Sequence, residues 1–115
     1  MNLIVKHRGK SRNLTVRRVG LLGKGFGLMF KSKNTESLFF DFKRDKNLSI
    51  TSFFVFFSFL VIWLDSENRV LDLRVVKPFR TYITSNKKFR RLVEIPFSSK
   101  NAEDIRFFVG KIRKV

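Results

Sequence analysis

Alternating apolar and polar positions run through much of the chain and predict a mainly β structure. Residues 3–5 and 14–16 place Leu or Val at every second position, on either side of a basic turn centred on Gly9. This period of two predicts a pair of strands joined as a hairpin. Further short strands are expected at residues 37–42, 80–84, 89–95 and 111–115. A charged turn is expected at 43–47, and Pro96 should end the strand before it, because proline cannot donate to a ladder.

The most apolar stretch covers residues 53–64, where only Ser58 interrupts the run. A membrane-spanning helix needs about 20 apolar residues, whereas a run of about 10–14 is more typical of buried core. The run is also rich in Phe, Val and Ile, which favour strands. It therefore predicts core, as two short strands around Ser58 or one long bent strand. Apolar residues alternate onto both faces, so this strand needs a cover on each side.

A second hairpin is predicted after this run. Residues 65–68 have the polar chemistry of a turn, and Pro78 should end the strand that follows. The apolar residues expected to share one face across the hairpin are Val61, Trp63, Val70, Leu71 and Leu73.

Residues 101–108 carry the clearest helix signal. Asn101 is placed as an N-cap, and Glu103 and Asp104 would suit the positive end of the helix dipole. Gly110 should end the helix. The whole pattern predicts a mainly β (β-rich α+β) fold. We expect a small compact domain of twisted or barrel-like antiparallel sheets, with one short C-terminal helix. A length of 115 residues is typical of a single domain spanning 1–115, with a basic N-terminal hairpin at 1–19.

The strongest compositional signal is positive charge. The chain has 25 Lys and Arg against 9 Asp and Glu, a net charge of +16. Residues 1–35 hold no acid, and neither do residues 73–93. Such an excess repels itself in a folded domain and indicates a polyanionic partner.

Catalytic and metal-binding chemistry is poorly represented. There is no cysteine, and the single histidine, His7, lies in a basic stretch where it is expected to be solvated or to contact a partner. Asp72 and Glu94 stand alone in basic strands and are expected to form charge-balancing pairs. We therefore predict a protein that is not an enzyme and that has no cofactor or metal.

Two other short segments bear on binding and location. The glycine-rich stretch at 20–27 lacks the order of a P-loop, and a tight turn is the simpler interpretation. The N-terminal residues lack the apolar core of a secretory signal, which predicts a cytoplasmic location. The short apolar run at 53–64 predicts that there is no transmembrane segment.

The second half of the chain resembles the uncharacterised family DUF192, most closely its short archaeal members. The resemblance rests on an ordered set of segments covering about residues 20–112: GLMF at 27–30, FFVFFSFLVIWLD at 53–65, RVLDLRVVKPFRTY at 69–82, FRRLVEIP at 89–96 and VGKI at 109–112. It implies a DUF192-like core at 20–112 that is compact and mainly β. It implies no activity.

This sequence departs from the family pattern at several positions. Relatives usually carry Pro and Asp where this chain has Ser58 and Leu60, and bulky residues where it has Thr51 and Ser52. A Gly-Asp pair of the family is replaced by Gly110-Lys111. A ligand site built from those side chains in relatives would be absent here.

The basic segments are the best functional signal. Residues 77–91 interleave cations with Phe79, Tyr82 and Phe89, a pattern that suits phosphate contacts and base stacking. The simpler expectation for Phe79 and Phe89 is core. The predicted RNA-binding residues are Lys6, Arg8, Lys10, Arg12, Arg17, Arg18, Lys77, Arg80, Tyr82, Lys87, Lys88, Arg90 and Arg91.

Three whole-protein hypotheses follow from these patterns. The first is a non-enzymatic RNA-binding protein, an accessory component of a ribonucleoprotein such as the archaeal ribosome, with ribosomal RNA and neighbouring ribosomal proteins as partners. The second is a small-ligand-binding or enzymatic domain of the uncharacterised family, although no small-molecule substrate is evident. The third is a peripheral membrane protein that is attracted by charge and inserts exposed Phe residues.

Overall fold

Six β-strands and one short α-helix make up the described part of the chain. The computed structural model describes residues 1–19, 28, 31–46, 49–50, 52, 55–80, 83–85 and 87–110. The strands are β1 (Asn2–His7), β2 (Lys10–Arg18), β3 (Ser37–Lys46), β4 (Phe59–Leu64), β5 (Val70–Val76) and β6 (Phe89–Pro96). A 3-10 turn, η2 (Ser99–Asn101), leads into helix α1 (Ala102–Val109). The predicted β-rich single domain with a short C-terminal helix is confirmed.

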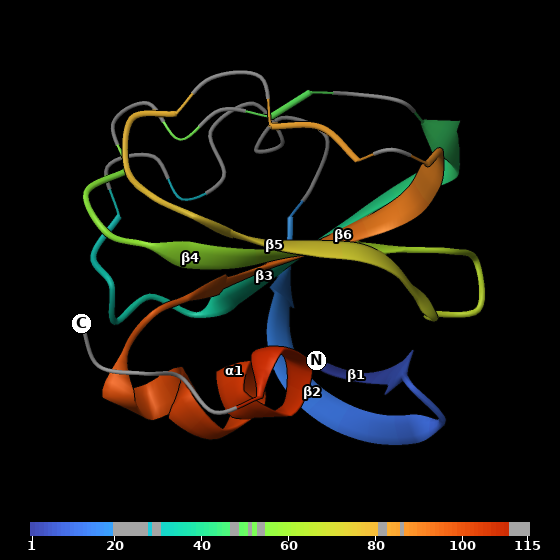
Figure 1. Cartoon of the computed structure of the whole chain (residues 1–115), viewed down its shortest axis with the longest axis horizontal. Coiled ribbons are helices and arrows are strands. Elements are labelled where there is room, and N and C mark those ends of the chain that lie inside the picture. The colour runs from blue at the N-terminus through green and yellow to red at the C-terminus, as the bar shows by residue number, and fades with distance from the viewer. Residues whose placement is uncertain are drawn as a thin grey trace.

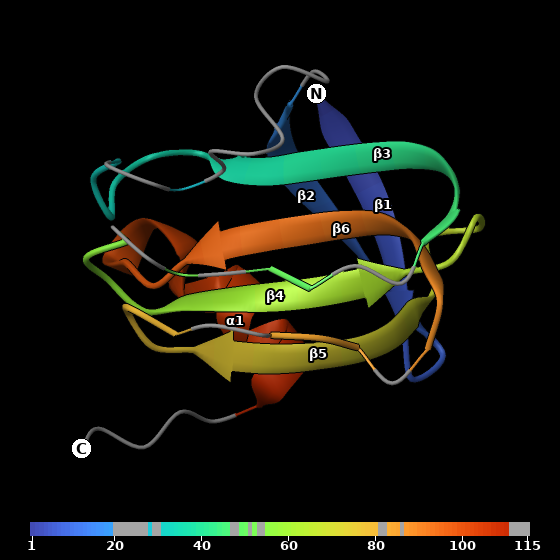
Figure 2. The same cartoon turned by 90° about the horizontal axis from the view of Figure 1, so that it is seen from above.

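The described strands form one sheet in the order β1-β2-β3-β6-β4-β5 (Figure 2). All neighbouring pairs are antiparallel except β2 and β3, which are parallel. The predicted antiparallel arrangement is therefore confirmed at every described pair except this one. Parallel pairing needs a crossover of about a dozen residues or more, and residues 19–36 between the two strands meet that requirement.

The sheet curls into a half-barrel, because its first and last strands approach each other. The backbone N–H of Lys6 in β1 donates to the carbonyl of Asn68, 2.9 Å away, just before β5. A parallel bridge joins Lys6 to Arg69 at the same place. Figure 1 shows the β1–β2 hairpin crossing beneath the rest of the sheet.

The curled sheet has two covered faces (Figure 1). We call the side beneath, covered by α1 and the β1–β2 hairpin, the helix face. Its buried side chains include Leu60, Ile62, Leu64, Val93 and Ile95 from the sheet and Ile105 and Phe108 from α1. We call the opposite side the loop face. Its buried side chains include Phe59, Val61, Trp63, Phe89 and Leu92 from the sheet and Leu28, Val55, Phe57 and Ile83 from the covering segments.

The described part of the apolar run is core on both faces, as its composition predicts, except at Phe56, which is exposed. Every residue of β4 is buried. Among the described residues, only the second half of the apolar run forms a strand. Residues 55–58, in its first half, pair with no neighbouring strand. The expectation of strand structure on both sides of Ser58 is thus wrong for 55–58. Residues 53 and 54 fall outside the described part. No described helix is long and apolar enough to cross a membrane.

Several local expectations need correction. Strand β3 continues to Lys46, through most of the turn expected at 43–47. Of the strand expected at 80–84, the described residues 80, 83 and 84 show one isolated bridge, between Ile50 and Ile83, while residues 81 and 82 lie outside the described part. A register shift after Trp63 puts Leu71 on the loop face but Val70 and Leu73 on the helix face. The five residues expected to share one face are therefore divided between two. The stretches 20–27 and 111–115 lie outside the described residues.

Helix α1 begins and ends close to its predicted limits, but Asn101 does not cap it. Its side-chain Nδ2 donates to the Pro96 carbonyl at 2.9 Å, and no side-chain cap hydrogen bond forms. Gly110 ends the helix with a φ of 75°, a conformation that glycine adopts without steric cost. Asn101 therefore connects the start of the helix to the end of β6.

Candidate nucleic-acid interface

The first basic segment is a tight hairpin whose tip is exposed. His7 pairs with Lys10, so Arg8 and Gly9 form a two-residue turn with φ values of 52° and 75°. Positive φ at both turn positions matches the right-handed twist of the flanking strands. The turn leaves Arg8 and Lys10 exposed, and Lys6, two residues before the turn, is exposed as well.

The second basic segment meets this hairpin at Asn68. Arg91 Nη1 donates to Asn68 Oδ1 at 2.7 Å, while the Asn68 carbonyl accepts from Lys6. Leu64 pairs with Arg91, so β6 begins beside the β4–β5 turn. Lys87 and Lys88 immediately precede β6 and are exposed. We call Lys6, Arg8, Lys10, Lys87 and Lys88 the basic end. Figure 1 shows the hairpin tip, the β4–β5 turn and the start of β6 at one side of the molecule.

Three of the predicted RNA-binding arginines form ion pairs within the fold. Arg12 Nε and Nη2 lie 2.9 and 2.8 Å from Asp104 Oδ1, which ties β2 to α1. Arg18 and Arg91 both approach Asp41 Oδ2, at 3.8 and 3.5 Å. These pairs match charge within the fold, so Arg12, Arg18 and Arg91 contribute less to an external field than the exposed cations. Arg17 is exposed, and Arg90 is half-buried.

The acidic residues of the β4–β5 turn, which lies at the basic end, bond to groups within the turn itself. Asp65 Oδ1 accepts from the backbone N–H groups of Glu67 and Arg69, and Asp65 Oδ2 pairs with Arg69 Nε at 2.7 Å. Burial acts to raise the pKa of Asp65, but the hydrogen bonds and charge of Arg69 outweigh it and lower the pKa overall. Glu67 also pairs with Arg69, at 3.0 Å. The predicted turn role of residues 65–68 is confirmed.

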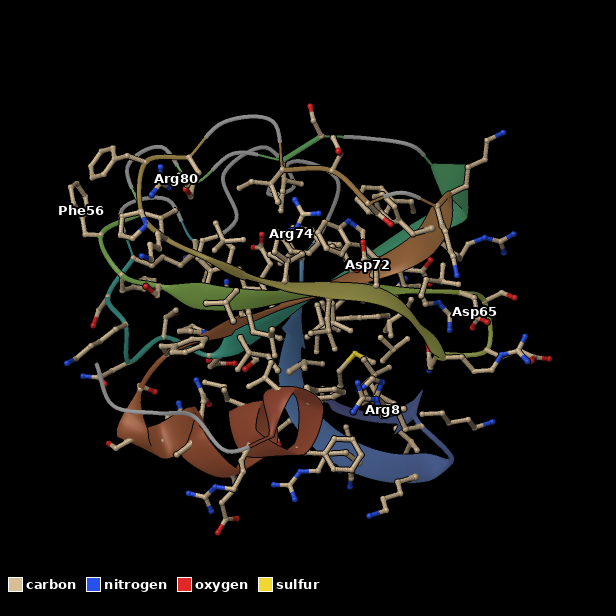
Figure 3. All side chains as sticks on the ribbon, viewed as in Figure 1. Arg8, Phe56, Asp65, Asp72, Arg74 and Arg80 are labelled. Carbon is tan, nitrogen blue, oxygen red and sulfur yellow. The ribbon has the colours of Figure 1, made fainter. Side chains whose placement is uncertain are left out.

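Lys77 and Arg80 lie at the other end of the sheet. Phe59 pairs with both Val76 and Pro96, so β5 ends where β6 ends, one strand length from Lys87. Strands of this length span about 20 Å. Figure 3 shows Arg80 and Phe56 on one side and Asp65 on the other. The predicted segment 77–91 is therefore not one surface. Tyr82 falls outside the described residues.

One buried carboxyl is out of keeping with its surroundings. Glu94 points to the loop face between Leu38 and Val61, and its Oε1 is buried without a hydrogen-bond partner in the described structure. Burial raises the pKa of Glu94 to about 7. Trp63, on the adjacent strand and the same face, has a buried Nε1 that also lacks a partner. The expected charge-balancing role of Glu94 was wrong.

Two charged residues of β5 share the loop face with this carboxyl, with β4 lying between them and Glu94. Arg74 lies over the Trp63 ring, with its guanidinium carbon 6.0 Å from the ring centroid. Asp72 Oδ1 accepts from the Leu73 N–H at 2.8 Å. Figure 3 shows both side chains on the loop face. Sequence reasoning missed this cluster, because the polar residues lie on three different strands.

The single histidine is packed rather than solvated. His7 contacts the rings of Phe107 and Phe108, with centroids 6.4 and 5.8 Å away, and its Nε2 is buried. Burial and the charge of Arg8 lower its pKa, against a hydrogen bond with the Phe108 backbone. The expectation of a solvated histidine was therefore wrong at Nε2, while contact with a partner stays a prediction. Within the described ranges, no group of three or more His, Asp or Glu could hold a metal ion.

Comparison with known proteins adds fold similarity and one relative by sequence. No family model matches the chain. The chain is similar to the UPF0127 protein PH1112 of Pyrococcus horikoshii, with 38% identity over 74 residues. The match spans 64% of this chain and 64% of that protein, less than two thirds of its length. It supports a relationship to an uncharacterised family.

Two solved structures share the architecture. One is a protein of unknown function from Novosphingobium aromaticivorans, with a TM-score of 0.71 and 14% identity, covering 89% of this chain and 76% of that one. The other is a proposed transcription regulator from Sinorhizobium meliloti, with a TM-score of 0.70 and 15% identity, covering 87% and 81%. At these identities the likeness shows the fold alone.

Proposed function

We propose that this chain is a non-enzymatic RNA-binding protein, an accessory component of a ribonucleoprotein such as the archaeal ribosome. The observation that carries the proposal is the double contact at Asn68. Its carbonyl accepts from β1 and its side chain accepts from β6, which ties two distant basic segments to one turn. The basic end is therefore built from both acid-free parts of the chain.

Charge makes RNA phosphate the best-matched partner for this end. Three carboxylates form ion pairs within the chain, because Asp41, Asp65 and Asp104 are each paired with an arginine. The exposed lysines of the basic end lie outside the ion pairs given above. Cations that neutralise phosphates release condensed counterions, so the binding should weaken steeply with salt. The contacts are to the backbone, which supports recognition of RNA structure rather than sequence.

We also propose that the chain is a divergent member of DUF192. The ordered segments between residues 20 and 112 support this, and so does the relative of uncharacterised family. Ser58 and Leu60 mark the divergence, because Leu60 packs in the helix face where the family pattern has Asp. A polar ligand site of relatives at that position would be replaced here by core.

The direct test is RNA binding by a charge-reversal pair and a matched control. Lys87→Glu with Lys88→Glu should weaken binding to a ribosomal RNA fragment at least tenfold and make the log–log salt slope shallower by about 2. Lys33→Glu with Lys100→Glu makes the same charge change at exposed sites away from the basic end, and should cost less. Fluorescence anisotropy across a salt series measures both effects. Absent or salt-insensitive binding by the unaltered protein contradicts the proposal.

One observation favours a second function, the binding of a small ligand at the loop face. Buried polar atoms without partners are rare in native proteins, and the unpaired Glu94 Oε1 and Trp63 Nε1 lie on adjacent strands of one face. Thermal shift across a metabolite and metal panel, run in parallel on Glu94→Gln, tests it. A stabilising compound whose effect disappears in Glu94→Gln would support this function over RNA binding.

A further inference from the structure

The turn at residues 77–80 is held in an unusual conformation by one buried serine. Phe79 has a φ of 59°, which is rare for a bulky residue that is not glycine. Ser52, fully buried, accepts at its carbonyl from the Phe79 N–H at 2.9 Å and donates from its own N–H to the Arg80 carbonyl at 2.8 Å. Its hydroxyl donates to the Lys77 carbonyl at 2.8 Å and accepts from the Arg80 N–H. Ser52 thus fixes the turn through both its backbone and its hydroxyl group.

The fixed turn presents an aromatic pair to solvent. Phe79 is 48% exposed and Phe56 is 62% exposed, and their rings meet edge to face with centroids 5.4 Å apart. The core expectation for Phe79 was therefore wrong, although Phe89 is buried as expected. A strained backbone persists only where its surroundings enforce it, and such strain concentrates at functional sites. Here the enforced conformation holds a ring out of the core.

Cations frame the pair. Lys77 and Arg80, both exposed, lie within two residues of Phe79 on either side. Figure 3 shows Arg80 and Phe56 near each other at one end of the molecule. We call Phe56, Lys77, Phe79 and Arg80 the aromatic turn. Rings that stack on bases, combined with cations that follow the backbone, are the pattern by which proteins bind single-stranded nucleic acid.

We propose that the aromatic turn binds an unpaired nucleobase of RNA, with Lys77 and Arg80 contacting the flanking phosphates. This inference rests on the proposed RNA-binding function. It adds that part of the bound RNA is single-stranded. The basic end and the aromatic turn lie about one strand length apart, roughly 20 Å. A duplex held at the basic end would therefore present a neighbouring loop or single-stranded end to the aromatic turn.

The small apolar area of the aromatic pair and its fixed geometry favour RNA over a membrane as the occupant. A single acyl chain gives only marginal membrane binding, and two partly exposed rings offer less apolar area than such a chain. Stacking on a base needs only one ring face, and a fixed ring loses little conformational entropy on binding. The geometry of a fixed pair with flanking cations thus suits a base better than a bilayer.

The test compares single-stranded and double-stranded RNA. Phe79→Asn removes the ring, and asparagine tolerates the positive φ. It should weaken binding to a ten-nucleotide oligouridine about tenfold or more, without changing the salt slope or the affinity for a duplex. Phe79→Trp should retain binding. Phe56→Ser, at a position without positive φ, gives the same readout if Phe79→Asn fails to fold.

Each outcome has one meaning. If the unaltered protein binds neither RNA, the proposed function fails, and this inference with it. If it binds both and the Phe variants bind oligouridine equally well, the aromatic turn does not bind a base, while the proposed function stands. If the variants lose only their partition with phosphatidylserine vesicles, the turn is a membrane contact and the inference is overturned.

Discussion

The two faces of strand β6 differ in how they treat polar groups. On the helix face, Val93 and Ile95 are fully buried among apolar residues, and the charged groups at its margin are paired, as in Arg12 with Asp104. On the loop face, Glu94 is buried with an unpaired oxygen, and the covering segments hold Phe79 in a strained turn. Strand β6 therefore contributes to an apolar, charge-matched layer on one face and to a layer with a buried unpaired carboxyl on the other.

This difference indicates a division of work within a small domain. Regular elements close the helix face, and they can satisfy backbone groups and exclude water together. Irregular segments cover the loop face, and irregular segments carry function more often because they tolerate special conformations. A domain can keep a strained turn and a buried unpaired carboxyl on its loop face only if its helix face supplies enough stability.

The largest expected effect compares the same substitution on the two faces. Ile95→Ala should lower the free energy of unfolding by about 2–5 kcal/mol, because neighbouring strands and α1 cannot collapse into the cavity. Ile83→Ala removes an equally apolar buried side chain from the loop layer, where the covering segments can relax, and should cost clearly less. Urea unfolding of both variants measures the difference. Equal losses would show that the two faces are packed alike.

A smaller effect concerns pH and the loop face. The pKa of Glu94 is raised to about 7 in the folded protein, so folding favours the protonated carboxyl. The resulting contribution to the free energy of unfolding is complete below the unfolded pKa near 4.5. That contribution is lost as pH rises toward 7, by about 3 kcal/mol in total. Glu94→Gln should remove this part of the decline in unfolding free energy between pH 5 and pH 8.

Denaturant melts at several pH values test the Glu94 prediction. Glu36→Gln, which alters an exposed carboxyl, is the control and should keep the decline. If Glu94→Gln and the unaltered protein decline in parallel, the carboxyl is charged at neutral pH and the loop face admits water or a counter-charge.

The smallest expected effect lies at the start of α1. Asn101→Ala removes the donor to the Pro96 carbonyl and should cost about 1 kcal/mol of unfolding free energy. Asn101→Asp separates two roles, because aspartate is a good N-cap but cannot donate to Pro96. If thermal melts show that Asn101→Asp is more stable than the unaltered protein, an N-cap at this position matters more than the hydrogen bond to Pro96. That result would contradict the conclusion that α1 is held through β6.

Local features could be predicted because their causes lie within a few residues. Gly9 and the polar residues 65–68 specify turns directly, and Gly110 ends the helix by its own conformation. The alternation within β1 and β2 likewise determines which side chains are buried. These parts of the fold needed no knowledge of distant neighbours.

The candidate sites could not be predicted, because they depend on contacts between distant segments. The parallel pairing of β2 with β3 leaves no local signal. The meeting of Lys6 and Arg91 at Asn68 joins residues far apart in the chain. Phe79 is exposed because Ser52, 27 positions earlier, fixes its backbone. A basic segment therefore predicted charge correctly but not which of its residues share a surface.

The backbone contact between Lys6 and Asn68 also bears on aggregation. Strands at the margins of a sheet offer unpaired N–H and C=O groups, which can recruit a second chain. Here β1 and β5 are the edge strands of the sheet. Their edges pair with each other at one point, the bridge between Lys6 and Arg69. Like charges on every copy would oppose stacking there. A phenylalanine-rich chain thus gains protection against intermolecular β-pairing from the same bond that assembles its basic end.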